Sequence, residues 1–219
     1  MSAATVPMGS ARSERPSVLE LFRDDGPLGA AIGAAAGRLV PLSPVALLLA
    51  AAVPLFAVVA ATGDGAPRGV VAGAVAWVVV LGGLASARPL TGRLRWVVPP
   101  ALRGIELGGL LWIAAVAGSS SAPAVFALLC AIAYHHYEAV YGMRHRGVAP
   151  PRWVQAAGGG WDGRLLVAVF LLLAGALPAG FFVLAGLLAV LFVGETIAEW
   201  RRVGPAQRPV YDDEEDEAG

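Results

Sequence analysis

The chain has 219 residues, of which 57% are hydrophobic, and a mean hydropathy of +0.68. This apolar content exceeds that of a typical soluble domain, so the composition predicts an all-α polytopic membrane protein. The formal net charge is zero, with 16 basic and 16 acidic residues, so charge gives no reason to expect nucleic acid as a partner. The single cysteine, Cys130, excludes an intrachain disulfide.

The first polar segment precedes the long apolar runs. Residues 1–16 are rich in Ser, Ala, Pro and Arg, and we expect them to be disordered. Residues 17–39 have the pattern of an N-terminal interfacial helix, which Ser17 and Glu20 would begin as a capping box. Gly26-Pro27 should break or kink this helix.

Three glycines recur at four-residue spacing within the same segment: Gly29, Gly33 and Gly37. Such a repeat leaves a smooth ridge on one helix face, where another helix can approach closely. A run of small residues with no packing role would give the same pattern, and both readings stay open at this stage.

Six apolar runs follow, each long enough or nearly long enough to cross a hydrocarbon core of ~30 Å. Their approximate limits are residues 44–62, 69–87, 97–118, 122–143, 165–179 and 181–200. We therefore predict one six-span membrane domain over residues 17–202, with the interfacial helix at its start. Residues 203–219, which carry an acidic run, are expected to form a disordered tail.

The basic residues indicate the orientation. With six spans, both termini lie on one side, and fourteen of the sixteen arginines then fall on that side. Only Arg68 lies on the other side, and Arg103 lies within a span. Because basic loops stay in the cytoplasm, we expect both termini to be cytoplasmic. The protein should lie in a bacterial inner membrane, with the lipid bilayer as its first partner.

Three of the predicted spans carry ionisable residues: Arg103 and Glu106 in the third, His135, His136 and Glu138 in the fourth, and Glu195 and Glu199 in the sixth. A charge at mid-membrane costs at least ~2.5 kcal/mol, so its presence requires a reason. Counted at about 1.5 Å per residue, Arg103, Glu138 and Glu195 lie roughly 9–12 Å inward from the cytoplasmic edge. This convergence predicts a polar cavity that is open to the cytoplasm.

The candidate pocket residues are Arg103, Glu106, His135, Tyr137, Glu138, Tyr141, Arg144, Asp162, Arg164 and Glu195. A helical wheel places Tyr137 and Glu138 on one arc and His136 nearly opposite, which favours the first two as pocket residues. Asp162 follows a run of three glycines and is expected to cap the helix that begins there. No catalytic residue is assigned.

Three interpretations of this cluster stay open. It can be a self-neutralising network that holds helices together, a ligand pocket, or a metal site. His135 with Glu138 and Glu195 could supply nitrogen and oxygen ligands, but no ligand spacing is diagnostic of a metal. We therefore predict neither a metal nor a cofactor, except for magnesium under the alternative function given below.

Leu42-Ser43-Pro44-Val45 at the start of the first span and Ala87-Arg88 at the end of the second resemble the CDP-alcohol phosphatidyltransferase family. The resemblance implies six spans, an N-terminal surface helix and a cytoplasmic active site with two metals. The family's metal-binding aspartates would fall at Val80, Gly83, Ala101 and Ile105. None is acidic, so the two-metal chemistry is lost, and the resemblance implies a degenerate, non-catalytic relative.

Other stretches resemble an actinobacterial membrane domain that is found attached to or beside such transferases and carries no known activity. The resemblance covers residues 17–202 and rests on residues 17–28, 98–106, 135–141 and 160–164. It implies a pocket that binds a lipid or nucleotide-alcohol or supports a partner. The possible partners are a lipid-headgroup transferase and a second copy of the chain.

Two alternative functions stay open. The chain could be an active headgroup transferase whose carboxylates have moved to Glu106, Glu138 and Glu195, which would then require magnesium. A small transporter is the third possibility, although no inverted repeat is evident between residues 44–118 and 122–200.

Overall fold

The computed structural model describes residues 22–146 and 150–202, and all regular structure within these ranges is helical. The predicted disordered segments, residues 1–16 and 203–219, lie outside the described residues, as do Ser17 and Glu20 of the predicted capping box. The helices are α2 (Pro27–Ala36), α3 (Pro44–Thr62), α4 (Arg68–Ser86), α5 (Val98–Ala117), α6 (Ala122–Tyr141), α7 (Arg152–Ala157), α8 (Gly160–Leu173) and α9 (Leu177–Arg202).

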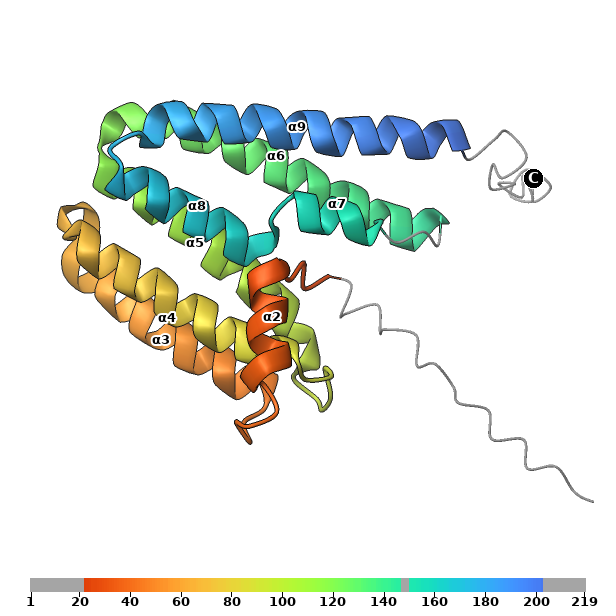
Figure 1. Ribbon diagram of the computed structural model, residues 1–219, viewed down its shortest axis with the longest axis horizontal. Coiled ribbons are helices and arrows are strands. Elements are labelled where there is room, and N and C mark those ends of the chain that lie inside the picture. The colour runs from red at the N-terminus through yellow and green to blue at the C-terminus, as the bar shows by residue number, and fades with distance from the viewer. Residues whose placement is uncertain (1–21, 147–149, 203–219) are drawn as a thin grey trace, which may run out of the picture.

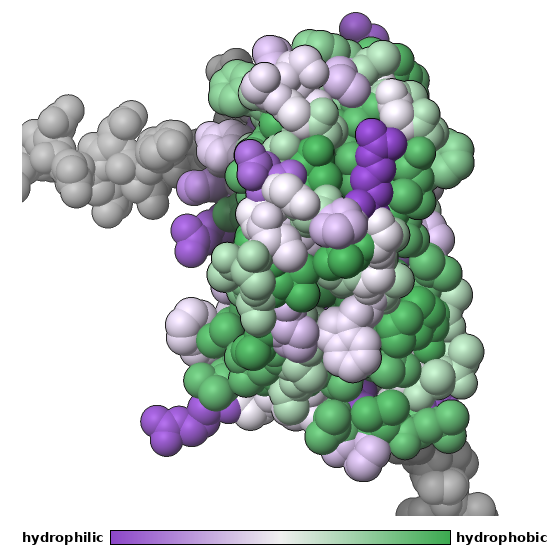
Figure 2. All heavy atoms as spheres, turned by 90° about the vertical axis from the view of Figure 1, so that its left-hand side faces the viewer, coloured by the Kyte–Doolittle hydropathy of each residue, from purple (hydrophilic) through white to green (hydrophobic). Residues whose placement is uncertain are grey.

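The six long helices, α3, α4, α5, α6, α8 and α9, alternate in direction along the chain (Figure 1). Consequently the starts of α3, α5 and α8 and the ends of α4, α6 and α9 lie toward one end of the bundle, and α2 lies there too. The connections at the opposite end are short. The opposite end is mostly apolar or weakly polar, with few strongly hydrophilic residues (Figure 2).

Five stretches among the described residues are long and apolar enough to span a membrane: Pro44–Gly65, Arg68–Ser86, Arg95–Ala117, Trp153–Leu173 and Leu177–Arg201. The predicted fourth span, α6, is not among them, because the polar run from Tyr134 to Glu138 lowers its hydropathy. Its 20 residues would still measure about 30 Å. The all-α polytopic prediction is thus confirmed, with five helices rather than six meeting the composition expected of a span.

The last helical hairpin turns earlier than the sequence suggested. Helix α8 ends at Leu173 and α9 already begins at Leu177, whereas the sequence placed the turn at Pro178-Ala179-Gly180. Proline is well tolerated in the first turn of a helix, where its missing N–H would have no partner in any case. Pro178 therefore lies in the first turn of α9 rather than separating it from α8.

Helix α2 is shorter than predicted and begins at Pro27, after a non-helical segment from Phe22. The glycine repeat on it packs closely, as the first of the two readings predicted. A Cβ on Gly33 would lie 2.2 Å from Ser86 Oγ and 2.8 Å from the carbonyl oxygen of Gly83. The hydroxyl of Ser86 also donates a hydrogen bond to the carbonyl of Gly29 at 3.0 Å. Helix α2 is thereby fixed against the end of α4.

Large apolar side chains cover much of the outer surface of the long helices. Those that are more than half exposed include Val53 and Phe56 on α3 and Val183, Leu187 and Val190 on α9. A soluble protein rarely exposes so much contiguous apolar surface, whereas lipid would cover it. The core between the helices is also apolar, and the buried charged residues gather at the end that holds α2.

Candidate functional site

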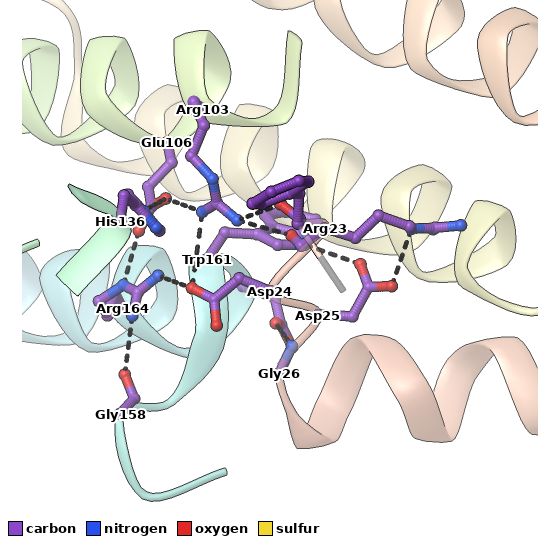
Figure 3. A network of polar contacts seen from close by, with 12 residues as sticks. Arg23, Asp24, Asp25, Gly26, Arg103, Glu106, His136, Gly158, Trp161 and Arg164 are labelled. Carbon is purple, nitrogen blue, oxygen red and sulfur yellow. Dashed lines mark hydrogen bonds and ion pairs between the residues drawn. The ribbon is translucent and has the colours of Figure 1, made fainter. Parts of the chain in front are cut away.

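Two arginines and two carboxylates form a buried ion network where the segment before α2 meets α5 and α8 (Figure 3). The guanidinium of Arg164 donates from Nε to Glu106 Oε1 and from Nη2 to Asp24 Oδ2, each at 2.6 Å. Arg103 Nη1 donates to Glu106 Oε2, also at 2.6 Å. The formal charges of these four groups sum to zero, which reduces the cost of burying them.

Glu106 is the centre of the network. Its side chain has no exposed surface, and each of its oxygens accepts a hydrogen bond from a different arginine. Glu106 and Arg103 lie three residues apart on α5, a spacing that places two side chains on one helix face. Arg164 reaches the same carboxylate from the second turn of α8. The network therefore joins α5 to α8 through charge-assisted hydrogen bonds, which are the stronger kind.

Arg103 also holds the segment that leads into α2. Its Nη2 donates to the carbonyls of Phe22 and Arg23, at 3.2 and 2.8 Å, and its Nη1 lies 3.6 Å from Asp24 Oδ2. The backbone of Asp24 has a φ of +50°, a conformation that Asp tolerates better than most residues. This turn directs the Asp24 carboxylate into the network.

Asp162 binds the start of α2 instead of its own helix. Its two carboxylate oxygens accept hydrogen bonds from the backbone N–H groups of Gly26 and Gly29, at 2.6 and 2.7 Å. Helix α8 begins at Gly160, and no side chain caps it. The prediction that Asp162 caps the helix on which it lies was therefore wrong. A carboxylate at a helix N-terminus is favourable because of the free N–H groups and the helix dipole.

Trp161 fills the space between α8, α4 and the segment before α2. Its indole N–H donates to Asp25 Oδ1 at 3.1 Å, and its ring lies against Gly82, where a Cβ would come within 2.5 Å of the indole. Arg23 completes this corner through an ion pair with Asp25 at 2.9 Å and a hydrogen bond to the carbonyl of Ala85. Burial raises the pKa of Asp25, although Arg23 and the indole N–H act in the opposite direction.

A cavity of about 290 Å³ lies beside this network. Its polar lining consists of Asp24, Arg103, His135, His136, Arg144 and Gln155, and its apolar lining of Phe22, Pro99, Pro100, Ala139 and Val140. Val140 is 38% exposed and Arg144 is exposed, so the cavity reaches the molecular surface. Its walls come from α5, α6, α7 and the segment before α2.

A second and much smaller pocket lies between α6 and α9. It is lined by three carboxylates, Glu138, Glu195 and Glu199, and also by His135, and its volume is about 10 Å³. This volume is about that of one water molecule. His135 lies between the two pockets, where its ring stacks on Phe192 with centroids 4.0 Å apart.

The structure brings some of the predicted site residues together and separates others. Arg103, Glu106 and Arg164 form part of the ion network (Figure 3), and Asp162 bonds to Gly26 and Gly29 beside it. His135 and Arg144 line the larger cavity. Glu138 and Glu195 line the smaller pocket instead. Tyr137 is 64% exposed and stacks on Tyr141, and neither tyrosine lines either pocket.

The helical wheel favoured Tyr137 over His136 as a pocket residue of α6. In the structure it is His136, and not Tyr137, that faces the network. His136 Nε2 lies 3.7 Å from Glu106 Oε2.

Sequence reasoning missed the part played by Arg23, Asp24 and Asp25. These residues lie in a non-helical segment, where helical periodicity gives no information. A usable signal was nevertheless present, because two adjacent carboxylates stand directly before the Gly26-Pro27 helix start. Each has a partner on a distant helix: Arg164 for Asp24, and Trp161 for Asp25.

Comparison with known proteins gives one result. A sequence model described as a "Family of unknown function (DUF5941)" matches residues 14–219. No match was found among curated proteins or among solved structures. Since the matched region covers almost the whole chain, including all the residues of the network and the cavity, the protein belongs to this family.

Proposed function

We propose that this membrane protein binds the phosphate-bearing headgroup of an anionic lipid or nucleotide-alcohol in its larger cavity, without catalysing a reaction. The observation that carries this proposal is the lining of the cavity. Arginine, histidine and amide side chains lie on the same walls as prolines, a phenylalanine and an exposed valine. A ligand with a charged head and an apolar body matches such a lining better than a purely polar metabolite does.

The charges of the lining favour an anion. Arg103 and Arg144 are its cationic side chains, and Asp24 is its carboxylate. Arg164 compensates the charge of Asp24, and Glu106 compensates the charge of Arg103, so Arg144 supplies the excess positive charge of the lining. Arg144 is exposed, so its guanidinium is accessible to a ligand at the mouth of the cavity. The planar guanidinium suits phosphate because it can donate two parallel hydrogen bonds.

The size and position of the cavity suggest a headgroup rather than a whole lipid. Its volume of about 290 Å³ lies at the lower end of the range for small-molecule sites, ~300–1,000 Å³. It opens beside Pro100 and Val140, near the end of the bundle where the predicted basic loops gather. Acyl chains could then remain in the bilayer while the phosphate reaches the arginines.

A rewired transferase has less support. Glu106 is bonded to two arginines, which leaves it poorly placed to hold a metal ion. Glu138 and Glu195 line the other pocket, where there is room for about one water. The three carboxylates required by that alternative thus lie in two different environments.

The expected setting of this function is the cytoplasmic face of a bacterial inner membrane. The distribution of arginines supports that orientation through the positive-inside rule. A lipid-headgroup transferase or a second copy of the chain remains the proposed partner. The resemblance to CDP-alcohol phosphatidyltransferases guides the choice of ligands to test.

The test is a binding titration of the full chain in mild detergent with short-chain CDP-diacylglycerol, phosphatidic acid and phosphatidylcholine. We expect the two anionic lipids to bind and Arg144→Gln to weaken both by about 10–100-fold, because one charge-assisted hydrogen bond contributes ~1.5–3 kcal/mol. Arg38→Gln is the matched control, because Arg38 is an exposed arginine just after α2 that does not line this cavity. Equal binding by wild type and Arg144→Gln, or equal affinity for phosphatidylcholine, would contradict the proposal.

A further inference from the structure

We propose that Asp24, His135 and His136 form a binding site for a divalent transition-metal ion such as Zn²⁺. Each residue offers one ligand atom, and the three atoms lie within 4.8 Å of one another. All three residues line the larger cavity. The ion is a separate ligand from the anionic headgroup, and its binding does not depend on that proposal.

Two of the three side chains carry buried atoms that lack a hydrogen-bond partner. Asp24 is 5% exposed, and its Oδ1 accepts no hydrogen bond from the described part of the chain. The same holds for His136 Nε2, whose distance of 3.7 Å from Glu106 Oε2 is longer than a hydrogen bond. Most buried polar atoms in proteins are paired, so two unpaired atoms beside one cavity require an explanation. A shared metal ion would satisfy both.

Surrounding contacts hold the ligands in place. Asp24 Oδ2 is fixed by Arg164 at 2.6 Å, which leaves Oδ1 as the oxygen available to an ion. The backbone carbonyl of Asp24 accepts a hydrogen bond from the N–H of Trp161 at 3.2 Å. The ring of His135 is held by stacking on Phe192, with an angle of 15° between the planes. Metal sites depend on such outer contacts to orient their ligands.

The set of donors indicates the class of ion. Two imidazole nitrogens and one carboxylate oxygen suit Zn²⁺ and its first-row neighbours, whereas Mg²⁺ and Ca²⁺ prefer oxygen ligands throughout. Zinc–ligand bonds are ~2.0–2.2 Å long, which places tetrahedral ligand atoms ~3.4 Å apart, so the three side chains would have to move inward when the ion binds. Three protein ligands leave a fourth position open, as in zinc sites that also bind a small molecule.

The charges around the site also have to be considered. Arg103 and Arg164 oppose a cation, while Asp24 and Glu106 favour it, and these four charges cancel. Two neutral histidines would bring no further charge. The site therefore requires the coordination bonds themselves to supply the affinity, which favours a transition ion over a hard cation held by charge alone.

The experiment measures zinc binding to the full-length chain, purified through a tag without histidine, stripped with a chelator and carried in a Cys130→Ser background. Bound zinc is counted by elemental analysis, and affinity is measured by competition with a chromophoric chelator. Co²⁺ then reports the coordination geometry through its visible absorption. We expect one ion per chain and a tetrahedral Co²⁺ spectrum.

The chain offers a matched control, because it contains three histidines and His145 is not part of the group. We expect His136→Gln and His135→Gln to weaken zinc binding by more than ~100-fold, beyond the ~10–100-fold typical of an outer contact. His145→Gln should bind as wild type does. His136→Gln is the main variant. Among the described residues, His136 Nε2 has no hydrogen-bond partner, so the substitution removes no hydrogen bond of this atom from the fold.

Wild-type zinc binding that persists in both His135→Gln and His136→Gln would place the ion elsewhere, for example on the acidic run near the C-terminus, and would overturn the proposal. Absence of zinc from a wild-type protein that elutes as a single folded species would overturn it as well. Loss of anionic-lipid binding with intact zinc binding would count against the proposed function only.

Discussion

Replacing Glu106 by glutamine keeps the size of the side chain and removes its charge. In the folded protein this carboxylate has no exposed surface and accepts hydrogen bonds from Arg103 and Arg164, each at 2.6 Å. Glutamine can still accept one of these hydrogen bonds. Its amide NH₂ would face the other guanidinium, which is also a donor. The variant therefore keeps the positive charges of the buried Arg164 and the partly buried Arg103, with only Asp24 to balance them.

The expected loss of stability follows from the cost of breaking a buried ion pair. Removing one partner of a buried ion pair typically costs ~3–5 kcal/mol. For a chain of this size, 1 kcal/mol corresponds to about 2–4 °C in melting temperature. We therefore expect Glu106→Gln to melt roughly 6–20 °C below wild type.

The assay is the apparent melting temperature of the purified protein in mild detergent, read as the loss of the monodisperse peak in size-exclusion chromatography. Asp64→Asn is the control, because it removes one carboxylate from an exposed turn at the other end of the bundle. It should melt within a degree or two of wild type. If Glu106→Gln melts like Asp64→Asn, the buried charges of the network do not depend on one another for stability.

Three further predictions concern the segment around α2. Asp162→Ala should increase amide hydrogen exchange in α2, because two buried N–H groups lose their acceptor at a cost of ~1–3 kcal/mol; unchanged exchange would contradict this. Gly33→Ala should lower the melting temperature, since its Cβ would clash with α4, while Gly73→Ala, which meets open space, should leave it unchanged or raise it slightly. The pKa of Asp25 is raised by burial, so the folded state binds this proton more tightly than the unfolded state. Stability then falls as pH rises from the unfolded pKa to the folded one. The melting temperature of Asp25→Asn should therefore rise relative to that of wild type as pH increases across that interval. A relative decrease would contradict the direction of the pKa shift.

Much of the membrane architecture could be predicted from the sequence, because apolar runs long enough for a bilayer have few alternatives to a helix. The glycine repeat on α2 was also informative, since Gly33 lies at the contact with α4. The predicted fourth span was the exception. Its polar residues, which pointed to a site, also lowered its hydropathy below that of the other five helices.

The candidate site was predicted less completely. Arg103 and Glu106 lie three residues apart on one helix, so their pairing follows from local geometry. The partners of Asp24 and Asp162 could not be inferred in this way. Asp24 meets Arg164 across 140 positions of sequence, and Asp162 meets Gly26 across 136. Such contacts depend on how α2 crosses the ends of α4 and α8, which periodicity does not specify.

The misplacement of His136 has a different cause. A helical wheel gives the angle between side chains on one helix but does not show which face meets the rest of the protein. Tyr137 and Glu138 suggested one face of α6, while the structure turns His136 toward Glu106 and leaves Tyr137 exposed.

The most direct test of the central claim is to map where an anionic phospholipid with a photoreactive group near its phosphate attaches to the protein in a bilayer. If the cavity binds the headgroup, labelled peptides should come from its walls, near Pro100, Val140 and Gln155. Labelling there should decrease in Arg144→Gln and persist in Arg38→Gln. Labelling spread evenly over the apolar outer surface, or unchanged in Arg144→Gln, would show that the cavity does not bind the headgroup.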